Sequence, residues 1–187
     1  MSFIQIREWQ PFDERGRKYL NREETRRFLL AADRLAPRSR ALCYVLAYTG
    51  CRVSEALHLS RRNLDAGNGA LVFRTLKRRG VTYRAVPIPE RLAAMLLALS
   101  APEGGRLWTM HRATAWRHVS RAMALADVRG PMACCKGLRH GFGIRAASAS
   151  IPANLIQRWM GHASGETTAI YLDAVGAEER GFARRLW

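Results

Sequence analysis

Five short segments of this 187-residue chain carry side chains that can bind or attack a phosphate group, and long stretches of sequence separate them. In chain order they hold Arg52 with Glu55, then Lys77, then Lys136 with Arg139, then His162, and finally Tyr171. A guanidinium group binds phosphate oxygens through two parallel hydrogen bonds, and a phenol is a competent nucleophile. If a fold brings these groups together, they form a metal-free phosphate-binding site with a nucleophile beside it.

Each segment taken alone also has an ordinary structural interpretation. An arginine in a basic protein is commonly solvated, His162 after Gly161 can cap a helix, and Tyr171 between Ile170 and Leu172 can simply pack. Glu55, three residues after Arg52, can hold that guanidinium or cap the backbone. The order of the five segments weakens these interpretations when the segments are considered together.

The segments resemble the catalytic domain of the tyrosine recombinases, the lambda-integrase-like or phage integrase family. The resemblance extends over about residues 21–175. It rests on the runs YTGCRVSEALHL, LKRRG, KGLRHGFG, WMGHAS and TTAIYLDAV. Arg139 precedes His162 by 23 residues and His162 precedes Tyr171 by 9, and both intervals suit the family. The resemblance implies a mainly α fold with a small antiparallel β-sheet (α+β).

The resemblance also implies roles for six residues. Arg52 matches the first catalytic arginine, Lys77 the hairpin lysine, Arg139 the second arginine, His162 the His-or-Trp position and Tyr171 the nucleophile. Lys136 stands where most members carry histidine and some carry lysine. The implied activity is site-specific DNA cleavage and rejoining through a covalent 3′-phosphotyrosine intermediate.

The chemistry of these groups suits that activity. A phosphotyrosine stores the energy of the broken phosphodiester, so rejoining needs no ATP. Two guanidinium groups stabilise the charge that builds on the phosphate oxygens, and His162 adds a hydrogen bond. Lys77 can protonate the departing 5′ oxygen. Lys136 either helps to deprotonate Tyr171 or adds positive charge. No metal or cofactor is expected, and the four cysteines lack the spacing of a zinc site.

The charge of the chain favours a polyanionic partner. Lysine and arginine number 31 against 15 acids, which gives a formal charge of +16. Residues 66–89 hold five bases and no acid, and residues 104–165 hold nine bases and one acid. Double-stranded DNA is the expected partner. No run is apolar enough to span a bilayer, and the start of the chain lacks a secretory signal. We therefore expect a cytoplasmic, DNA-associated bacterial protein that does not bind a membrane.

Several further residues are candidates for DNA contact. They lie on the expected hairpin and on an expected helix over residues 111–126, and they are Arg74, Arg78, Arg79, Arg112, Thr114, Arg117 and Arg121. In the family the equivalent helix faces the major groove. A solvated basic face is the alternative for this helix, and charge pattern alone does not separate the two.

Periodicity and turn residues predict the elements that must position these groups. Helices are expected over residues 21–35, 38–48, 53–59, 90–100, 111–126, 137–149, 153–160 and 166–173, and strands over 70–75 and 81–88. Residues 1–20 are interpreted as an N-terminal arm, 21–175 as the catalytic domain and 176–187 as a C-terminal tail. Phe182, Leu186 and Trp187 of that tail are expected to dock on a neighbouring protomer.

The chain is short for a member of this family. Family members usually carry an N-terminal DNA-binding domain that closes a clamp. We therefore expect a natural short protein, a truncated one, or one that uses accessory proteins, acting as a tetramer on DNA.

A non-catalytic DNA-binding accessory or regulatory protein on the same fold is the main alternative. A basic helical repressor is a further one, and it explains neither Lys77 nor the five segments.

Overall fold

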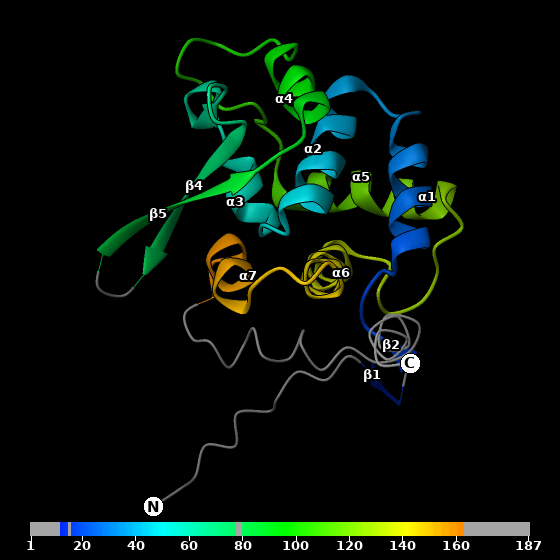
Figure 1. The fold of residues 1–187 in the computed structure, drawn as a ribbon. Coiled ribbons are helices and arrows are strands. Elements are labelled where there is room, and N and C mark those ends of the chain that lie inside the picture. Colours follow the sequence, from blue (N-terminus) through cyan, green and yellow to red (C-terminus); the bar gives the residue numbers. More distant parts are fainter. Residues whose placement is uncertain (1–11, 15, 78–79, 163–187) are drawn as a thin grey trace, which may run out of the picture.

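A computed structural model describes residues 12–14, 16–77 and 80–162 of the chain (Figure 1). Over these ranges the helices are α1 (Arg22–Ala32), α2 (Pro37–Thr49), α3 (Val53–Leu57), the 3-10 turn η1 (Arg61–Asn63), α4 (Glu90–Leu97), α5 (Arg112–Leu125), α6 (Cys135–Ser148) and α7 (Ala153–Met160). The strands are β1 (Phe12–Asp13), β2 (Gly16–Arg17), β3 (Leu64–Asp65), β4 (Ala70–Lys77) and β5 (Gly80–Pro87). The predicted mainly helical fold with a small antiparallel sheet is confirmed.

The first two helices begin and end where local chemistry predicts. Asn21 caps α1: its Oδ1 accepts from the Glu24 backbone N at 2.8 Å, and Glu24 Oε2 accepts from the Asn21 backbone N at 2.9 Å. Helix α2 is buried on nearly every side and forms the centre of the core. It ends at Gly50, which adopts a left-handed φ of 59°. The chain can therefore turn sharply just before Arg52.

The three-stranded sheet has the order β3-β4-β5 and is antiparallel throughout. In the β4–β5 hairpin Phe73 lies opposite Arg84, and Lys77 pairs with Gly80 at the tip. The hairpin was predicted. The two-residue strands β1, β2 and β3 were not, because so short a segment has no measurable periodicity. Helix α6 begins two residues earlier than predicted, so Lys136 lies inside its first turn.

The helices and the sheet meet around the end of α2. Figure 1 places α6 below α2 and α7 between α6 and the sheet, and residue contacts join α2 to α6, α6 to α7 and α7 to β5. Tyr19 and Leu20, at the end of the expected arm, are buried, and the Leu20 backbone N donates to Gly137 O at 3.2 Å. The described residues contain no helix with the length and hydropathy to cross a membrane. The expected helix over 166–173 and the tail lie outside the described residues.

Candidate active site

The end of α2 places Arg52 at the beginning of α3. A Cβ atom on Gly50 would lie 2.5 Å from Phe142 Cδ1, so the close approach of α6 as well as the positive φ requires glycine. Arg52 is the N-cap residue of α3, and its backbone N donates to Glu55 Oε2 at 2.8 Å. The Arg52 side chain is half exposed. Its backbone is thus fixed while its guanidinium remains accessible.

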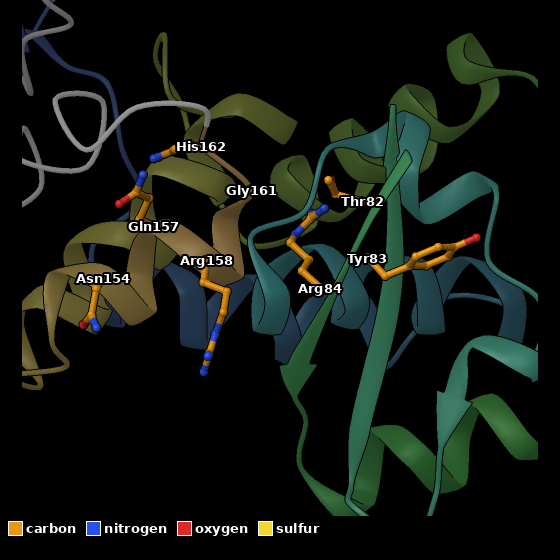
Figure 2. A pocket seen from close by; sticks show the side chains of 8 residues that line it. All are labelled: Thr82, Tyr83, Arg84, Asn154, Gln157, Arg158, Gly161 and His162. Carbon is orange, nitrogen blue, oxygen red and sulfur yellow. The ribbon is translucent and has the colours of Figure 1, made fainter. Parts of the chain in front are cut away.

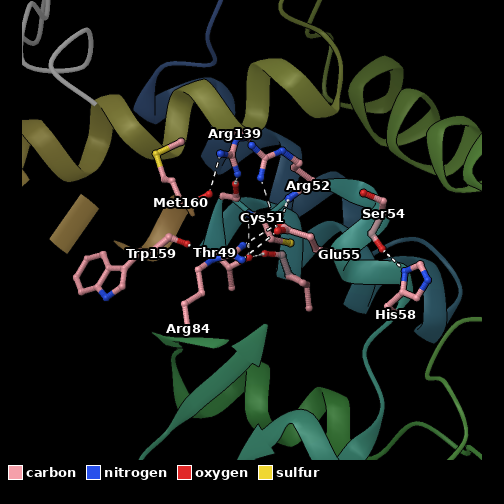
Figure 3. Close-up of polar contacts among 12 residues, drawn as sticks. Thr49, Cys51, Arg52, Ser54, Glu55, His58, Arg84, Arg139, Trp159 and Met160 are labelled. Carbon is pink, nitrogen blue, oxygen red and sulfur yellow. Dashed lines mark hydrogen bonds and ion pairs between the residues drawn. The ribbon is translucent and has the colours of Figure 1, made fainter. Parts of the chain in front are cut away.

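Arg139 joins two loops that carry site residues. From α6 its Nη1 donates to Gly50 O at 2.6 Å and its Nη2 donates to Met160 O at 2.8 Å. Gly50 lies two residues before Arg52, and Met160 lies two residues before His162. Figure 3 shows the Arg139 and Arg52 side chains next to each other above α3. The second predicted arginine therefore lies beside the first.

His162 follows the end of α7 and is buried. Gly161 takes a left-handed φ of 66°, and the His162 backbone N donates to Gln157 O at 3.1 Å. Burial, together with the positive charges of Arg139, Arg52 and Arg84, lowers the pKa of His162 to about 4. His162 is therefore neutral near pH 7. Arg52, Arg139 and His162, which are far apart in sequence, come together in the fold.

Lys136 lies one helical turn before Arg139, in the first turn of α6, and is exposed. The charge of Lys136 acts on His140, a buried residue of the same helix. Burial lowers the pKa of His140 to about 3, and the charges of Lys136, Arg139, His162 and Lys18 add to that effect. The start of α6 is thus a strongly positive region, suited to a bound anion.

Four of the predicted site residues have limited or no description. Strand β4 ends at Lys77, which the register places at the tip of the hairpin. Tyr171 lies outside the described residues, and so do Arg78 and Arg79. The positions of these side chains relative to Arg52, Arg139 and His162 stay predictions.

The candidate DNA-contact residues of α5 lie on its solvent side. Arg112, Arg117 and Arg121 are exposed, and Arg117 Nη2 donates to Thr114 Oγ1 at 3.0 Å. The opposite side of α5 packs into the core through Ala115, Val119, Ala122 and Met123. On β4, Arg74 is also exposed.

A buried ion pair that the sequence did not predict lies below these groups (Figure 3). Arg84 of β5 donates from Nη1 to Glu55 Oε1 at 2.9 Å and from Nη2 to Glu55 Oε2 at 2.8 Å. Burial raises the pKa of Glu55, but the hydrogen bonds and charge of Arg84 and the contacts with Arg52 outweigh it, so the net pKa is lowered. Glu55 was predicted to hold Arg52 or cap the backbone, and the structure confirms the cap.

Arg84 had a signal in the sequence, namely strand alternation. On β5 it shares the inward face with Val86 and Ile88, while Tyr83 and Ala85 face outward. A charged residue in phase with the buried positions of a strand requires a buried partner of opposite charge. Arg84 was counted only among the basic residues of the hairpin region.

A pocket of about 320 Å³ opens between β5 and α7 (Figure 2). Its lining combines polar groups from both elements and consists of Thr82, Tyr83, Arg84, Asn154, Gln157, Arg158, Gly161 and His162. His162 is therefore one of the residues that line this pocket. Within residues 12–14, 16–77 and 80–162, no group of three or more His, Cys, Asp or Glu side chains is placed to hold a metal ion.

Known proteins with a similar sequence are recombinases. The chain is 29% identical over 166 residues to tyrosine recombinase XerA of Thermococcus kodakarensis, covering 82% of this chain and 57% of the relative. It is 34% identical over 151 residues to tyrosine recombinase XerC of Rhodospirillum centenum, covering 73% of this chain and 42% of the relative. The chain thus spans about half the length of the curated relatives it matches.

Solved structures with the same fold are also recombinases. The crystal structure of XerA recombinase superposes with a TM-score of 0.78 at 25% identity, covering 90% of this chain and 64% of that one. XerH site-specific recombinase bound to palindromic difH substrate, in a post-cleavage complex, gives a TM-score of 0.75 at 25% identity, covering 91% and 53%.

The family model for the phage integrases matches residues 18–177, which include all five segments that carry the candidate site. The match extends beyond the described residues to Tyr171. With the clustered Arg52, Arg139 and His162 and the relatives above, this match identifies the chain as a member of the phage integrase family of tyrosine recombinases, in its catalytic region.

Proposed function

We propose that this chain is a site-specific DNA recombinase that cleaves and rejoins double-stranded DNA through a covalent 3′-phosphotyrosine, without metal or ATP. The observation that carries the proposal is the approach of Arg52, Arg139 and His162 from three separate elements. Arg139 hydrogen-bonds the backbone before each of the other two residues. Such a preorganised group of donors stabilises charge that develops on a phosphate.

In the proposed mechanism the Tyr171 oxygen attacks the scissile phosphorus while the bond to the 5′ oxygen breaks. Arg52 and Arg139 bind the non-bridging oxygens, and neutral His162 donates a hydrogen bond to them. Lys77, at the hairpin tip, gives a proton to the leaving 5′ oxygen. Lys136 takes part in deprotonating Tyr171 or adds positive charge. The reverse sequence rejoins the strand.

We further propose how the chain grips DNA and assembles. The exposed arginines of α5 and Arg74 contact the duplex, together with Arg78 and Arg79 of the hairpin. Residues 1–20 form an arm, 21–175 the catalytic domain and 176–187 a tail that docks on a neighbouring protomer in a tetramer on DNA. Accessory proteins complete the grip. XerH bound to difH substrate supports DNA as the partner.

The deciding experiment is covalent trapping of DNA. Labelled duplexes made from the DNA that flanks the gene, nicked so that the cleaved end diffuses away, are incubated with the protein and run on a detergent gel. We expect a shifted band with the wild-type chain and none with Tyr171→Phe, which should keep the same DNA affinity. Absence of the band with the wild-type chain, alongside intact salt-sensitive DNA binding, would support a non-catalytic accessory protein instead.

A further inference from the structure

We propose that Arg84 is a positioning residue that holds the carboxylate of Glu55 away from Arg52 and so leaves the Arg52 guanidinium available for phosphate. The inference rests on the proposed function of Arg52 as a phosphate-binding group. It concerns a residue outside the six to which the family resemblance assigns a role. Two cations, Arg52 and Arg84, lie within 4 Å of the Glu55 carboxylate.

The distances show which cation Glu55 pairs with. Both carboxylate oxygens accept from the Arg84 fork, at 2.9 and 2.8 Å, whereas Arg52 Nη1 lies 3.7 Å from Glu55 Oε1. The longer contact exceeds hydrogen-bond length. The Arg84 and Glu55 side chains are 6% and 10% exposed, while that of Arg52 is 50% exposed. Glu55 therefore satisfies its charge in the interior, and Arg52 faces solvent.

Arg84 is itself fixed by three further contacts. Its Nε donates to Trp159 O at 2.9 Å, and its Cζ lies 4.9 Å from the centre of the Phe73 ring. A Cβ atom on Gly161 would lie 3.0 Å from Arg84 Cζ, so the guanidinium packs directly against the residue before His162. Figure 2 shows Arg84 extending from β5 into the space beside α7. One side chain thus connects α3, the hairpin and the segment that ends at His162.

Removing Arg84 should redirect Glu55 to Arg52. The buried carboxylate loses its two charge-assisted hydrogen bonds, and Arg52 lies 3.7 Å away as the replacement cation. Closing that distance draws the guanidinium out of the phosphate site. Neutralising Glu55 at the same time removes the attraction. The second substitution should therefore restore part of what the first one loses, which a general loss of packing does not predict.

The experiment measures single-turnover cleavage at saturating DNA for Arg84→Met, Glu55→Gln and the double variant, using the duplex that the wild-type chain traps. Arg84→Met should cleave about 100-fold more slowly, which is typical of losing one transition-state donor. The double variant should cleave at least about fivefold faster than Arg84→Met, a coupling usual for residues in contact. A double variant no faster than Arg84→Met overturns the proposal.

Arg145→Met is the matched control for loss of a buried arginine. Arg145 on α6 donates to Thr25 Oγ1 at 2.9 Å and to Ala47 O at 2.8 Å, and neither of these bonds involves Glu55. This variant should lower the melting temperature but leave the cleavage rate of the folded protein unchanged. If Arg84→Met does not fold, Arg84→Lys replaces it in the comparison of single and double variants. Lysine keeps the positive charge but lacks the two parallel donors of the guanidinium group.

A second measurement separates this inference from the proposed function. Phenylglyoxal modifies accessible arginines, and the rate at Arg52 is measured by mass spectrometry against the exposed Arg121 of the same chain. The relative rate at Arg52 should fall in Arg84→Met and recover in the double variant, whether or not any DNA is cleaved. An unchanged rate at Arg52 in Arg84→Met overturns the inference, and failure of the wild-type chain to trap DNA overturns only the proposed function.

Discussion

At the scale of single residues, the site is unusual in holding two buried imidazoles among cations. Burial lowers the pKa of His162 to about 4 and that of His140 to about 3, and nearby arginines and Lys136 contribute in the same direction. Both groups thus stay neutral in the folded protein at pH values where an unfolded chain protonates them. A neutral imidazole can donate one hydrogen bond to a phosphate without charge repulsion from Arg52 and Arg139.

The free protein should therefore lose stability on mild acidification. The unfolded histidines bind protons below their ordinary pKa of 6.5 and the folded ones do not, so stability is full above that value and falls as the pH drops toward about 4. Between pH 7 and 5 each histidine should cost about 2 kcal/mol of unfolding free energy. Urea titrations at both pH values measure this.

Substitution of a buried histidine tests whether it causes this loss of stability. His140→Gln should remove roughly half of the pH dependence, since half of the linked protons come from this group. His58→Gln, at an exposed position of the chain, serves as the control substitution. Equal pH dependence in wild type and His140→Gln would contradict the burial argument.

At the scale of elements, the ends of two helices position two of the candidate catalytic groups. Arg52 follows the end of α2, His162 follows the end of α7, and a glycine in the left-handed region precedes each of them by two residues or fewer. Arg139 then donates hydrogen bonds to the carbonyl oxygens of Gly50 and Met160, just before these two residues. The packing of α2, α6 and α7 thus sets the positions of Gly50 and Met160, and through them the positions of Arg52 and His162.

Gly50→Ala should therefore impair both stability and cleavage. The positive φ costs about 1–2 kcal/mol for a residue with a Cβ, and that atom would lie 2.5 Å from Phe142 Cδ1. The carbonyl that Arg139 binds would shift with the backbone. We expect a clear fall in melting temperature and a cleavage rate reduced by at least about tenfold, since small misplacements of catalytic groups are costly.

Gly67→Ala is the matched control, because a Cβ there meets only Asp65 Oδ1 at an ordinary 3.7 Å. It should behave like the wild-type chain in both assays. A Gly50→Ala protein with normal stability and normal cleavage would show that α6 does not constrain this junction.

At the scale of the whole molecule, the charge of +16 is placed unevenly and should dominate DNA binding. Part of it lies on the exposed side of α5, which carries Arg112, Arg117 and Arg121. Binding should weaken steeply as salt rises, because phosphate contacts release counterions. The logarithm of affinity should fall linearly with the logarithm of salt concentration.

Arg112→Gln and Arg121→Gln should each reduce the steepness of that line by about one unit, the amount expected for one phosphate contact. Arg26→Gln is the control of equal charge. Arg26 is exposed on α1 and paired with Glu23 at 2.7 Å. Fluorescence anisotropy on a short duplex at several salt concentrations provides the measurement. If Arg26→Gln changes the slope as much as the α5 variants, α5 is not the contacting face.

Local sequence patterns predict most of the described helices and the β4–β5 hairpin of this protein. Helix caps such as Asn21 with Glu24, the stop at Gly50 and the hairpin between residues 70 and 88 depend on interactions between close neighbours, so a local pattern predicts them. The segments around Arg52, Arg139 and His162 were found from residue type and spacing. The short strands β1, β2 and β3 were missed because two residues carry no pattern.

How the motifs are joined depends on the packing of elements that are distant in the sequence. The bonds from Arg139 to Gly50 and Met160 connect residues 89 and 21 positions apart, and the pair of Arg84 with Glu55 connects residues 29 apart. Whether such groups meet depends on how α6, α7 and the sheet pack around α2, which no local propensity specifies. Strand alternation on β5 indicates that Arg84 faces inward. Its partner, Glu55, lies on α3 and is brought to it by the packing of α3 against the hairpin. A buried charge is stable only beside the particular group that neutralises it.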